Sequence, residues 1–500
     1  MIVPTLLPPA SGGRPATPPQ HEVPLVAALR DFARRKTLPF STPGHKLGVG
    51  LDPEIRDLVG DRFPAADVWL NTADLDRAVR EAETLAAAAW CADRSFFLVN
   101  GSTVGNLALL LATIGPGDEV VVGRDVHQSL LAALILTGAS PVWVTPRIHA
   151  ETGLGLGLDP GAVADALDDH PAARLAVVTS PTSWGVASDL ATTVAVAHAR
   201  GVPVHVDEAW GSHFPFHPAL PRSAMACGAD SAVTSPHKLL SGLSQAALLN
   251  LRGNRLPVAR VGSAIRLLQT TSPLLPVLAS LDACRRQMAL AGRDLLDLTL
   301  ELAEMARGEL EAIAGVSVVD HRRLGLPADR FDPTRLVVDF TGLGLSGHEA
   351  ERRLRTSHGI APEMSDPRGV VFLVSIGDTP ESIGRLVRAV RAVARGGPGA
   401  ARAVPPSLDA ATITPGEQHL IPRDAWFAAS RAVPLAAAEG RVAAEPVIPY
   451  PPGIPVLTPG EVVSKEKLAC LRDGLATGMH LRGTADPRLH TLRVVDLPGA

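Results

Sequence analysis

Short apolar runs alternate with helix-length stretches from about residue 73 to residue 262. The runs hold four or five residues each and are rich in valine, as expected of strands that are buried on both faces. Helix-length stretches between such strands are typical of a mostly parallel sheet covered by helices on both sides. The pattern predicts an α/β fold with a large doubly wound core, whose strands span residues 95–99, 119–122, 141–144, 175–179, 202–206 and 231–234.

The segments on either side of this core follow other patterns. An amphipathic helix is predicted over residues 21–36 and a long helix over residues 272–307. A smaller α/β unit is indicated by two further strands and two helices, near residues 336–340, 370–376, 348–358 and 381–394. The predicted divisions are a flexible tail (1–20), an N-terminal segment (21–72), a large domain (73–310), a small α/β domain (311–395), a Gly/Pro-rich linker (396–416) and a C-terminal domain (417–500).

The composition is that of a globular protein with two or three domains, since 46% of the 500 residues are hydrophobic and 20% are charged. A formal net charge of −4 gives no basic field, which argues against nucleic acid or an anionic membrane as a partner. The longest apolar stretches, such as residues 107–114, are too short to span a bilayer. The four cysteines form no C-x-x-C pair, so we expect neither a disulfide framework nor a zinc site, and a cytoplasmic location.

The segment Asn-Gly-Ser-Thr-Val-Gly-Asn at residues 100–106 follows a predicted strand and opens a predicted helix over 107–113. A helix N-terminus offers unpaired N–H groups and the positive end of the helix dipole, and Ser102 and Thr103 add hydroxyl donors. The segment therefore favours a phosphate site. It is explained equally well as a helix capped by Ser102 without a ligand.

A second segment, residues 204–211, is an apolar strand that ends in Asp207. Ligands bind at this carboxyl edge of open α/β sheets, and a carboxylate there can keep a pyridine nitrogen protonated. The small Ala209 leaves room for a flat ring, and the indole N–H of Trp210 can donate to a ring hydroxyl. Taken alone, Asp207 is more often an aspartate that caps a turn.

A third segment, Ser235-Pro236-His237-Lys238, follows another apolar run. A lysine beside a buried cofactor is a candidate Schiff-base former, and Ser235 and His237 can contact a phosphate. An isolated lysine is usually a surface residue, but Lys238 sits in an otherwise uncharged stretch. Between a strand and a helix, His127 can stack on the ring face opposite Ala209, although a single histidine there is more often a helix cap.

In this order, a phosphate-binding turn, a stacking imidazole, a strand-end aspartate and a lysine describe the fold-type-I enzymes that use pyridoxal 5'-phosphate (PLP). The predicted fold is thus the aspartate aminotransferase-like α/β fold of PLP-dependent transferases. Residues 73–310 would form the large PLP-binding domain.

From about residue 40 to residue 461, the chain resembles the bacterial ornithine/lysine/arginine decarboxylases of this fold. The run Pro-Tyr-Pro-Pro-Gly-Ile-Pro at 449–455, followed by Pro-Gly-Glu at 459–461, is similar to the family's C-terminal domain, which generic aminotransferases lack. Further matching segments lie at residues 42–46 (Thr-Pro-Gly-His-Lys), 97–103, 206–214, 234–238, 270–273, 280–283, 359–363 and 374–379.

The resemblance implies a role for each matching residue. Lys238 would hold PLP as a Schiff base, Asp207 would pair with the pyridine nitrogen, and His127 would stack on the ring. Ala209 and Trp210 would also contact the cofactor, and Lys238 or His237 would return a proton to the substrate Cα. The phosphate would be bound by Ser102, Thr103, Ser235 and His237, and the substrate would lie near His45, Lys46 and Glu363.

The implied reaction is decarboxylation of a basic L-amino acid to its amine and carbon dioxide, in polyamine-type metabolism, by a homodimer or larger homo-oligomer. Without an amino-terminal receiver-like domain, the chain resembles the shorter biosynthetic type, which favours arginine over lysine or ornithine. Two segments depart from the family pattern: Ser183 replaces an aromatic residue, and residues 70–83 are shorter. Two alternatives remain open, namely another fold-type-I reaction (transamination or Cα–Cβ cleavage) and a non-catalytic regulatory paralogue.

Overall fold

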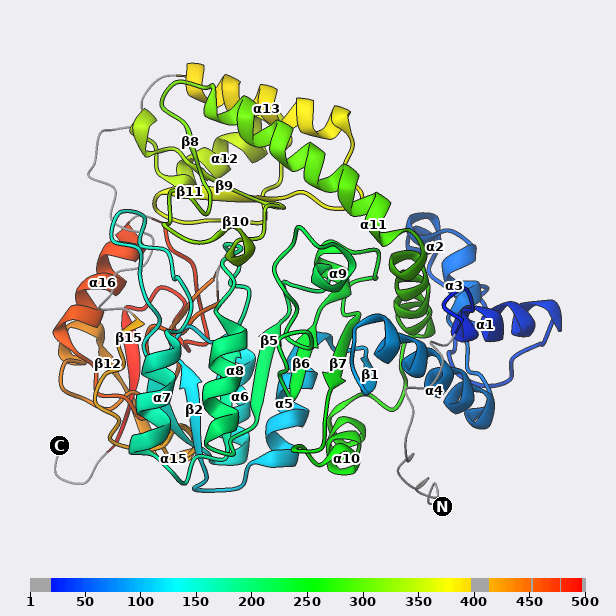
Figure 1. The fold of residues 1–500 in the computed structure, drawn as a ribbon, viewed down its shortest axis with the longest axis horizontal. Helices are drawn as coiled ribbons and strands as arrows, with labels where there is room; N and C mark the ends of the chain where they lie inside the picture. The colour runs from blue at the N-terminus through cyan, green and yellow to red at the C-terminus, as the bar shows by residue number, and fades with distance from the viewer. Residues whose placement is uncertain (1–18, 397–412, 451–452, 477, 497–500) are drawn as a thin grey trace.

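The computed structural model describes residues 19–396, 413–450, 453–476 and 478–496. Residues 1–18 of the predicted flexible tail (1–20) and residues 397–412 of the predicted linker (396–416) lie outside the described residues. Two α/β units and a C-terminal unit make up the described chain (Figure 1).

The large unit is built on a seven-stranded sheet with the order β1-β7-β6-β5-β4-β2-β3. All neighbouring strands are parallel except β7, which runs antiparallel to both β1 and β6. The six predicted strands are therefore confirmed as one mostly parallel sheet, and β7 is a strand that the pattern did not predict. The strands are β1 (Arg94–Leu98), β2 (Glu119–Gly123), β3 (Ser140–Val144), β4 (Leu175–Thr179), β5 (Val204–Glu208), β6 (Ser231–Thr234) and β7 (Ala247–Leu251).

Helices cover both faces of this sheet, because successive side chains of a buried strand point to opposite sides. Val120 and Val122 of β2 pack in one apolar cluster with α5 (Gly101–Thr113), α6 (Gln128–Thr137) and α10 (Val258–Leu268). Val121, between them, packs in another with α7 (Pro160–Asp169) and α8 (Leu190–Ala199). The alternation explains why these strands are apolar throughout and confirms the doubly wound core.

The N-terminal helices lie toward the β1 edge of the sheet, where α4 packs against β1 and α1 packs against α4 (Figure 1). They are α1 (Pro24–Arg34), α2 (Pro53–Val59), α3 (Arg62–Ala66) and α4 (Thr72–Ala89). The long helix α11 (Leu275–Glu311) begins against α1 and α4 and continues into the smaller unit, so that it joins the two.

The smaller unit has a four-stranded antiparallel sheet with the order β10-β11-β9-β8. Its core packs this sheet against the end of α11 and two further helices. Its elements are β8 (Ser317–Val319), β9 (Arg335–Asp339), α12 (Gly347–His358), β10 (Met364–Ser365), β11 (Gly369–Leu373) and α13 (Pro380–Arg395).

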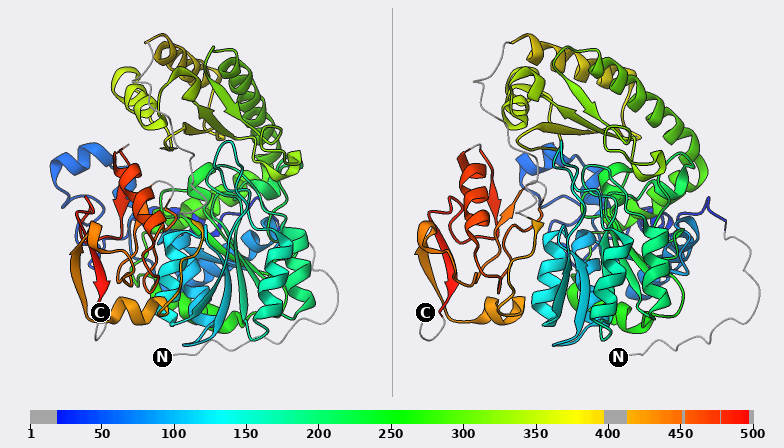
Figure 2. Two further views of the ribbon diagram at one scale, coloured as in Figure 1. Left: turned by 90° about the vertical axis from the view of Figure 1, so that its left-hand side faces the viewer. Right: turned by 60° about the vertical axis from the view of Figure 1, so that its left-hand side comes forward.

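The C-terminal unit lies against the side of the large unit, next to α6 (Figure 2). It has its own apolar cluster and two small antiparallel sheets. Its elements are α15 (Pro422–Phe427), β12 (Ser430–Pro434), β13 (Ile448–Pro449), α16 (Lys465–Ala476), β14 (Leu481–Arg482) and β15 (Thr491–Val495).

Short helices complete the described chain: α9 (Pro236–Leu239) and the 3-10 turns Phe214–Phe216, Ala328–Arg330, Thr341–Leu343 and Leu435–Ala437. Within the described residues, no helix is both long enough and apolar enough to cross a membrane.

Candidate active site

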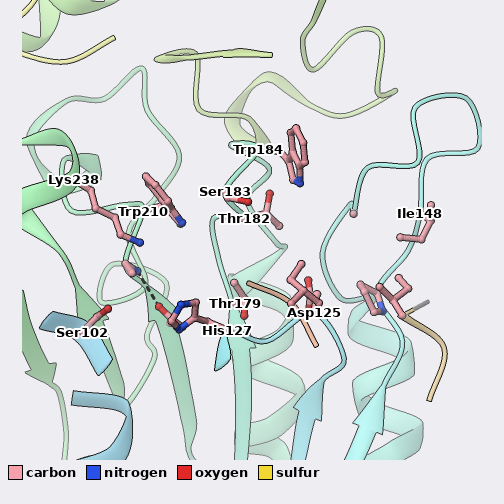
Figure 3. Close-up of a pocket in the computed structure, with 16 residues that line it drawn as sticks. Ser102, Asp125, His127, Ile148, Thr179, Thr182, Ser183, Trp184, Trp210 and Lys238 are labelled. Atoms are coloured by element: carbon pink, nitrogen blue, oxygen red, sulfur yellow. Dashed lines mark hydrogen bonds between the residues drawn. The ribbon is translucent and has the colours of Figure 1, made fainter. Parts of the chain in front are cut away.

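A partly open hollow lies at the carboxyl edge of β4, β5 and β6 (Figure 3). This is the edge at which open α/β sheets bind ligands. Six of the residues predicted from the sequence line it together: Ser102, His127, Asp207, Ala209, Trp210 and Lys238.

The predicted phosphate turn forms the start of helix α5. Asn100 is the N-cap residue, and its side chain makes no capping hydrogen bond. Ser102 therefore does not cap the helix. The hydroxyl of Ser235, which is not among the residues that line the hollow, is buried and has no hydrogen-bond partner among the described residues. A buried hydroxyl without a partner is costly unless a ligand satisfies it, so this turn and Ser235 fit a phosphate group.

Asp207 is the next-to-last residue of strand β5 and is only 4% exposed. Its Oδ1 accepts a hydrogen bond from the Ala209 backbone N–H at 3.2 Å, and its Oδ2 accepts one from Nδ2 of Asn106 at 3.0 Å. Asp207 thus caps the turn and also lines the pocket. A carboxylate held by two donors at this place fits the role of partner to a pyridine nitrogen.

His127 is the N-cap of helix α6, and its Nδ1 accepts a hydrogen bond from the Ser129 backbone N–H at 3.2 Å. The ring also borders the hollow, so His127 both caps a helix and faces the pocket. Burial lowers the pKa of its imidazole, although the charge of Asp207 opposes this. A neutral, flat ring at this place fits stacking on a cofactor.

Lys238 lies on the single turn of helix α9, directly after strand β6. Its Nζ is 3.7 Å from the centroid of the Trp210 ring. Burial lowers its pKa to about 8, while the carboxylates of Asp207 and Glu363 raise it and Arg335 lowers it further. A lysine with this pKa has free amine available near neutral pH, as covalent attachment of a cofactor requires.

Other predicted residues lie outside the pocket lining. Thr103 is exposed on the first turn of α5, and Nδ1 of His237 donates to the Ala246 carbonyl at 2.7 Å. Glu363 is exposed, and its negative charge raises the pKa of Lys238. The structure does not bring His45 or Lys46 to this hollow.

His45 and Lys46 belong instead to the N-terminal segment. Nε2 of His45 pairs with Asp67 at 3.1 Å, and Nζ of Lys46 donates to the Ser41 carbonyl. Their assignment to the substrate stays a prediction, because a single chain gives them no contact with the pocket.

The two segments that depart from the family pattern have different places. Ser183 and the neighbouring Trp184 line the hollow, so an aromatic side chain borders the site one residue later than the pattern expects. Residues 70–83 fall mainly in α4, and none of them is among the residues that line the hollow.

Sequence reasoning missed three buried residues beside the pocket: Asn106, Ser129 and His205. Their signal was present but weak. His205 lies two residues before Asp207 and therefore points to the same face of β5, as a polar side chain between valines. It also missed Asp125, which lines the hollow and whose pKa burial raises to about 6.

The smaller unit reaches the site through Arg335, the first residue of β9. Its guanidinium is fully buried, pairs with Asp332 at 3.4 Å, and donates to the Trp210 carbonyl at 3.2 Å. This contact supports the backbone that carries the Trp210 ring.

The C-terminal unit completes the wall behind His127. The Gln128 N–H at the start of α6 donates to the Gly453 carbonyl at 3.2 Å, and Ile454 lines the hollow. Arg124 donates to the Val456 carbonyl at 3.0 Å and pairs with Glu461 at 3.2 Å.

Comparisons with known proteins agree with this site. Residues 23–326 match the family model described as "Orn/Lys/Arg decarboxylase, major domain", and residues 409–472 match the C-terminal domain of the same family. Arginine decarboxylases from Bacillus subtilis and Halalkalibacterium halodurans are 38% and 39% identical, and each alignment covers 95% of this chain and 98% of the relative.

Solved structures show the same fold. The constitutive lysine decarboxylase of E. coli superposes with a TM-score of 0.81 at 23% identity, covering 95% of this chain and 82% of that one. The fold is therefore the fold-type-I architecture of PLP enzymes, as the sequence predicted. Together with the family match over most of its length, this establishes that the chain belongs to the Orn/Lys/Arg decarboxylase family of PLP-dependent amino-acid decarboxylases.

Proposed function

We propose that this protein decarboxylates a basic L-amino acid to its amine and carbon dioxide, with arginine favoured over lysine and ornithine. The preference is supported by relatives named arginine decarboxylase at 38–39% identity over nearly the whole chain. The observation that carries the proposal is that Lys238, Asp207 and His127 come from different strand ends and line one pocket.

The cofactor would supply the chemistry, since bound PLP withdraws the electron pair that remains at Cα when carbon dioxide leaves. Lys238 would hold the cofactor covalently, and Asp207 would keep the pyridine nitrogen protonated. His127 and Ala209 would enclose the ring from its two faces, and Trp210 would donate to its hydroxyl.

The phosphate would be held by the first turn of α5 with Ser102 and Thr103, and by Ser235 and His237. Ser235 is the strongest support, because its buried hydroxyl has no partner among the described residues.

A proton must return to Cα after decarboxylation, and Lys238 or His237 would deliver it. Lys238 is suited to this because a pKa of about 8 lets it gain and lose a proton near neutral pH. Burial lowers the pKa of His237, whose Nδ1–H is engaged by the Ala246 carbonyl.

We divide the chain into the N-terminal segment, large domain, small domain and C-terminal domain predicted from the sequence. The separate apolar clusters of the small and C-terminal units support this division.

We also propose a homodimer or larger homo-oligomer. Exposed large apolar side chains gather in the N-terminal segment, where they are Leu38, Phe40, Val49, Ile55, Leu58, Val59, Phe63 and Trp69. An exposed apolar patch of this kind is typical of a protein interface. A second copy covering it would also change the surroundings of His45 and Lys46, which lie in the same segment.

Substituting Leu58 tests this assembly. Leu58→Arg places a charge in the patch and is expected to shift the protein toward monomers in light scattering after gel filtration. Leu136→Arg is the matched control, because Leu136 is also exposed but lies on α6, far along the chain from the patch. Equal masses for both variants and the unchanged protein would exclude the patch as the interface.

A cytoplasmic location and a place in polyamine metabolism complete the proposal. No disulfide joins cysteines among the described residues, as a reducing compartment favours; the four cysteines are Cys91, Cys227, Cys284 and Cys470.

The function is tested by measuring carbon dioxide release from arginine, lysine and ornithine after reconstitution with PLP. We expect the highest kcat/KM with arginine. Formation of a keto acid without carbon dioxide would favour transamination instead, and binding of PLP without turnover of any of the three would favour a regulatory role.

A further inference from the structure

A chain of hydrogen bonds between buried polar side chains runs beneath the pocket. It links strands β5 and β6 with helices α5 and α6, and each member is 5% exposed or less except His127, which borders the hollow. It runs from Ser231 through His205 to Asn106, and from Asn106 one branch reaches Asp207 while the other reaches Ser129 and then His127. Asn106 is the branch point.

The partners of Asn106 fix the orientation of its amide. Its Nδ2 lies 3.0 Å from Oδ2 of Asp207 and 2.9 Å from Oγ of Ser129. An ionised carboxylate only accepts hydrogen bonds, so the NH2 group must face Asp207. The amide oxygen then faces Nε2 of His205 at 2.9 Å and accepts a hydrogen bond from it.

This orientation determines the tautomer of His205. Its Nε2 carries the proton that is donated to Asn106, and its Nδ1 lies 2.9 Å from Oγ of Ser231. Burial lowers the pKa of His205 to about 4, so the ring is neutral at pH 7 and Nδ1 accepts the Ser231 hydroxyl hydrogen. A neutral His205 adds no positive charge near Asp207.

The second branch reaches the ring of His127. Because Oγ of Ser129 accepts a hydrogen from Asn106, its own hydrogen is available for Nδ1 of His127 at 2.9 Å. The Ser129 backbone N–H donates to the same nitrogen at 3.2 Å. Nδ1 of the neutral ring is therefore an acceptor, and the proton of His127 is on Nε2.

We propose that Asn106 is a positioning residue that orients both Asp207 and His127 through one amide group, and that His205 locks this amide. The proposal rests on the proposed function in one respect, that Asp207 and His127 contact PLP. In that setting, a single side chain aligns the partner of the pyridine nitrogen with the ring that stacks on the cofactor.

The first test uses the protein without PLP, labelled with 15N in its histidines. We expect the His205 signal, identified by its absence in His205→Gln, to be that of a neutral ring with its proton on Nε2 that does not titrate between pH 5 and pH 8, and we expect this signal to change in Asn106→Leu. A His205 that titrates near its ordinary pKa, or that carries its proton on Nδ1, would overturn the proposal. Because this test needs neither cofactor nor turnover, it stands even if the proposed function fails.

The second test measures PLP affinity and the visible circular dichroism of bound PLP. Asn106→Leu removes the hydrogen bond to the Asp207 carboxylate, and His205→Leu removes the donor that holds the Asn106 amide in place. Each variant is therefore expected to bind PLP about tenfold or more weakly, because a hydrogen bond to a charged group is lost or weakened. His205→Gln keeps an N–H donor for the amide oxygen and is expected to restore affinity and dichroism to near the unchanged level. Comparing His205→Leu with His205→Gln also tests the proposal if Asn106→Leu fails to fold.

The matched control is Asn250→Leu. Asn250 is about as buried as Asn106 but lies on strand β7, and its Oδ1 accepts a hydrogen bond from Ser95 at 2.6 Å; neither residue lines the hollow. We expect this variant to melt at a lower temperature but to bind PLP with unchanged affinity and dichroism. If Asn106→Leu behaves as Asn250→Leu does, or if His205→Gln and His205→Leu are alike, Asn106 only fills the core and the proposal is wrong.

Discussion

The ammonium nitrogen of Lys238 lies 3.7 Å from the centroid of the Trp210 ring, so the lysine enters the pocket across an aromatic face (Figure 3). The ring excludes water from one side of the amine, and burial is the main reason that its pKa falls to about 8. About a tenth of the amine is then free at pH 7, whereas an ordinary lysine has less than about 0.1%. The site therefore contains an amine that is partly unprotonated near neutral pH and that lies against the Trp210 ring.

Replacing Lys238 by alanine tests the central assignment. Without this amine, we expect bound PLP to lack the long-wavelength absorbance of a covalently held cofactor, and turnover to fall by roughly 10³-fold or more. Lys465→Ala is the control, because Lys465 is exposed on α16 and is expected to leave absorbance and turnover unchanged. Normal turnover in Lys238→Ala would refute the assignment.

The pKa of Lys238 predicts how the reaction of the protein with PLP depends on pH. Only the free amine attacks the cofactor, so the rate is expected to rise with pH and to level off near pH 8 rather than near pH 10.5. Stopped-flow absorbance measures this rate, and Nα-acetyl-lysine in the same buffers corrects for the titration of PLP itself. A rate that still rises tenfold between pH 9 and pH 10 would contradict the lowered pKa.

The lowered pKa of Lys238 also makes the free energy of unfolding depend on pH. The folded state binds fewer protons at Lys238 than the unfolded state does between about pH 8 and pH 10.5. This residue therefore makes the protein more stable as the pH rises through that range, and it disfavours folding below it.

Much of the fold was predictable because strands buried on both faces are apolar throughout. The six parallel strands were found within two residues of their observed ends. Strand β7 was missed, although its sequence Ala-Leu-Leu-Asn-Leu is equally apolar. It returns antiparallel between β1 and β6, and a run of apolar residues carries no information about the direction or order of strands.

The lining of the candidate site was predictable where a residue type suggests one chemistry, as for Lys238 and Asp207. It was not predictable where the role depends on a partner that lies far along the chain. Asn106 is separated by 99 residues from His205, and only the hydrogen bond between them shows that the Asn106 amide is held in a fixed orientation. His45 and Lys46 were placed near the substrate by resemblance alone, and neither lines the hollow of this chain.

Gly105 tests how closely helix α5 must approach the sheet. A Cβ added there would lie 2.7 Å from Cγ2 of Val233 and 2.8 Å from Cδ1 of Leu98, which forces the phosphate turn away from β6. We expect Gly105→Ala to lower the free energy of unfolding by about 1–3 kcal/mol and to weaken PLP binding. Denaturant titration and a PLP titration measure the two effects.

Gly308 provides the control for a glycine within a helix. It lies in α11, and a Cβ added there would meet nothing within 4 Å. Gly308→Ala is expected to stabilise the protein by about 0.5–1 kcal/mol and to leave PLP affinity unchanged. If both variants bind PLP equally well, the close packing at Gly105 does not shape the phosphate turn.

Glu461 tests whether the C-terminal unit holds the pocket wall. Its carboxylate is 1% exposed, pairs with Arg124 at 3.2 Å and with Lys467, and these cations keep its pKa below the ordinary value despite burial. Glu461→Ala leaves Arg124 buried without its carboxylate, so we expect a loss of roughly 3–5 kcal/mol in unfolding free energy, measured by denaturant titration. Because Arg124 also holds the Val456 carbonyl, two residues beyond the pocket residue Ile454, PLP binding should weaken as well. Asp168→Ala removes the exposed pair with Arg200 and is expected to change neither quantity, whereas equal effects of the two substitutions would contradict a role for the buried cluster.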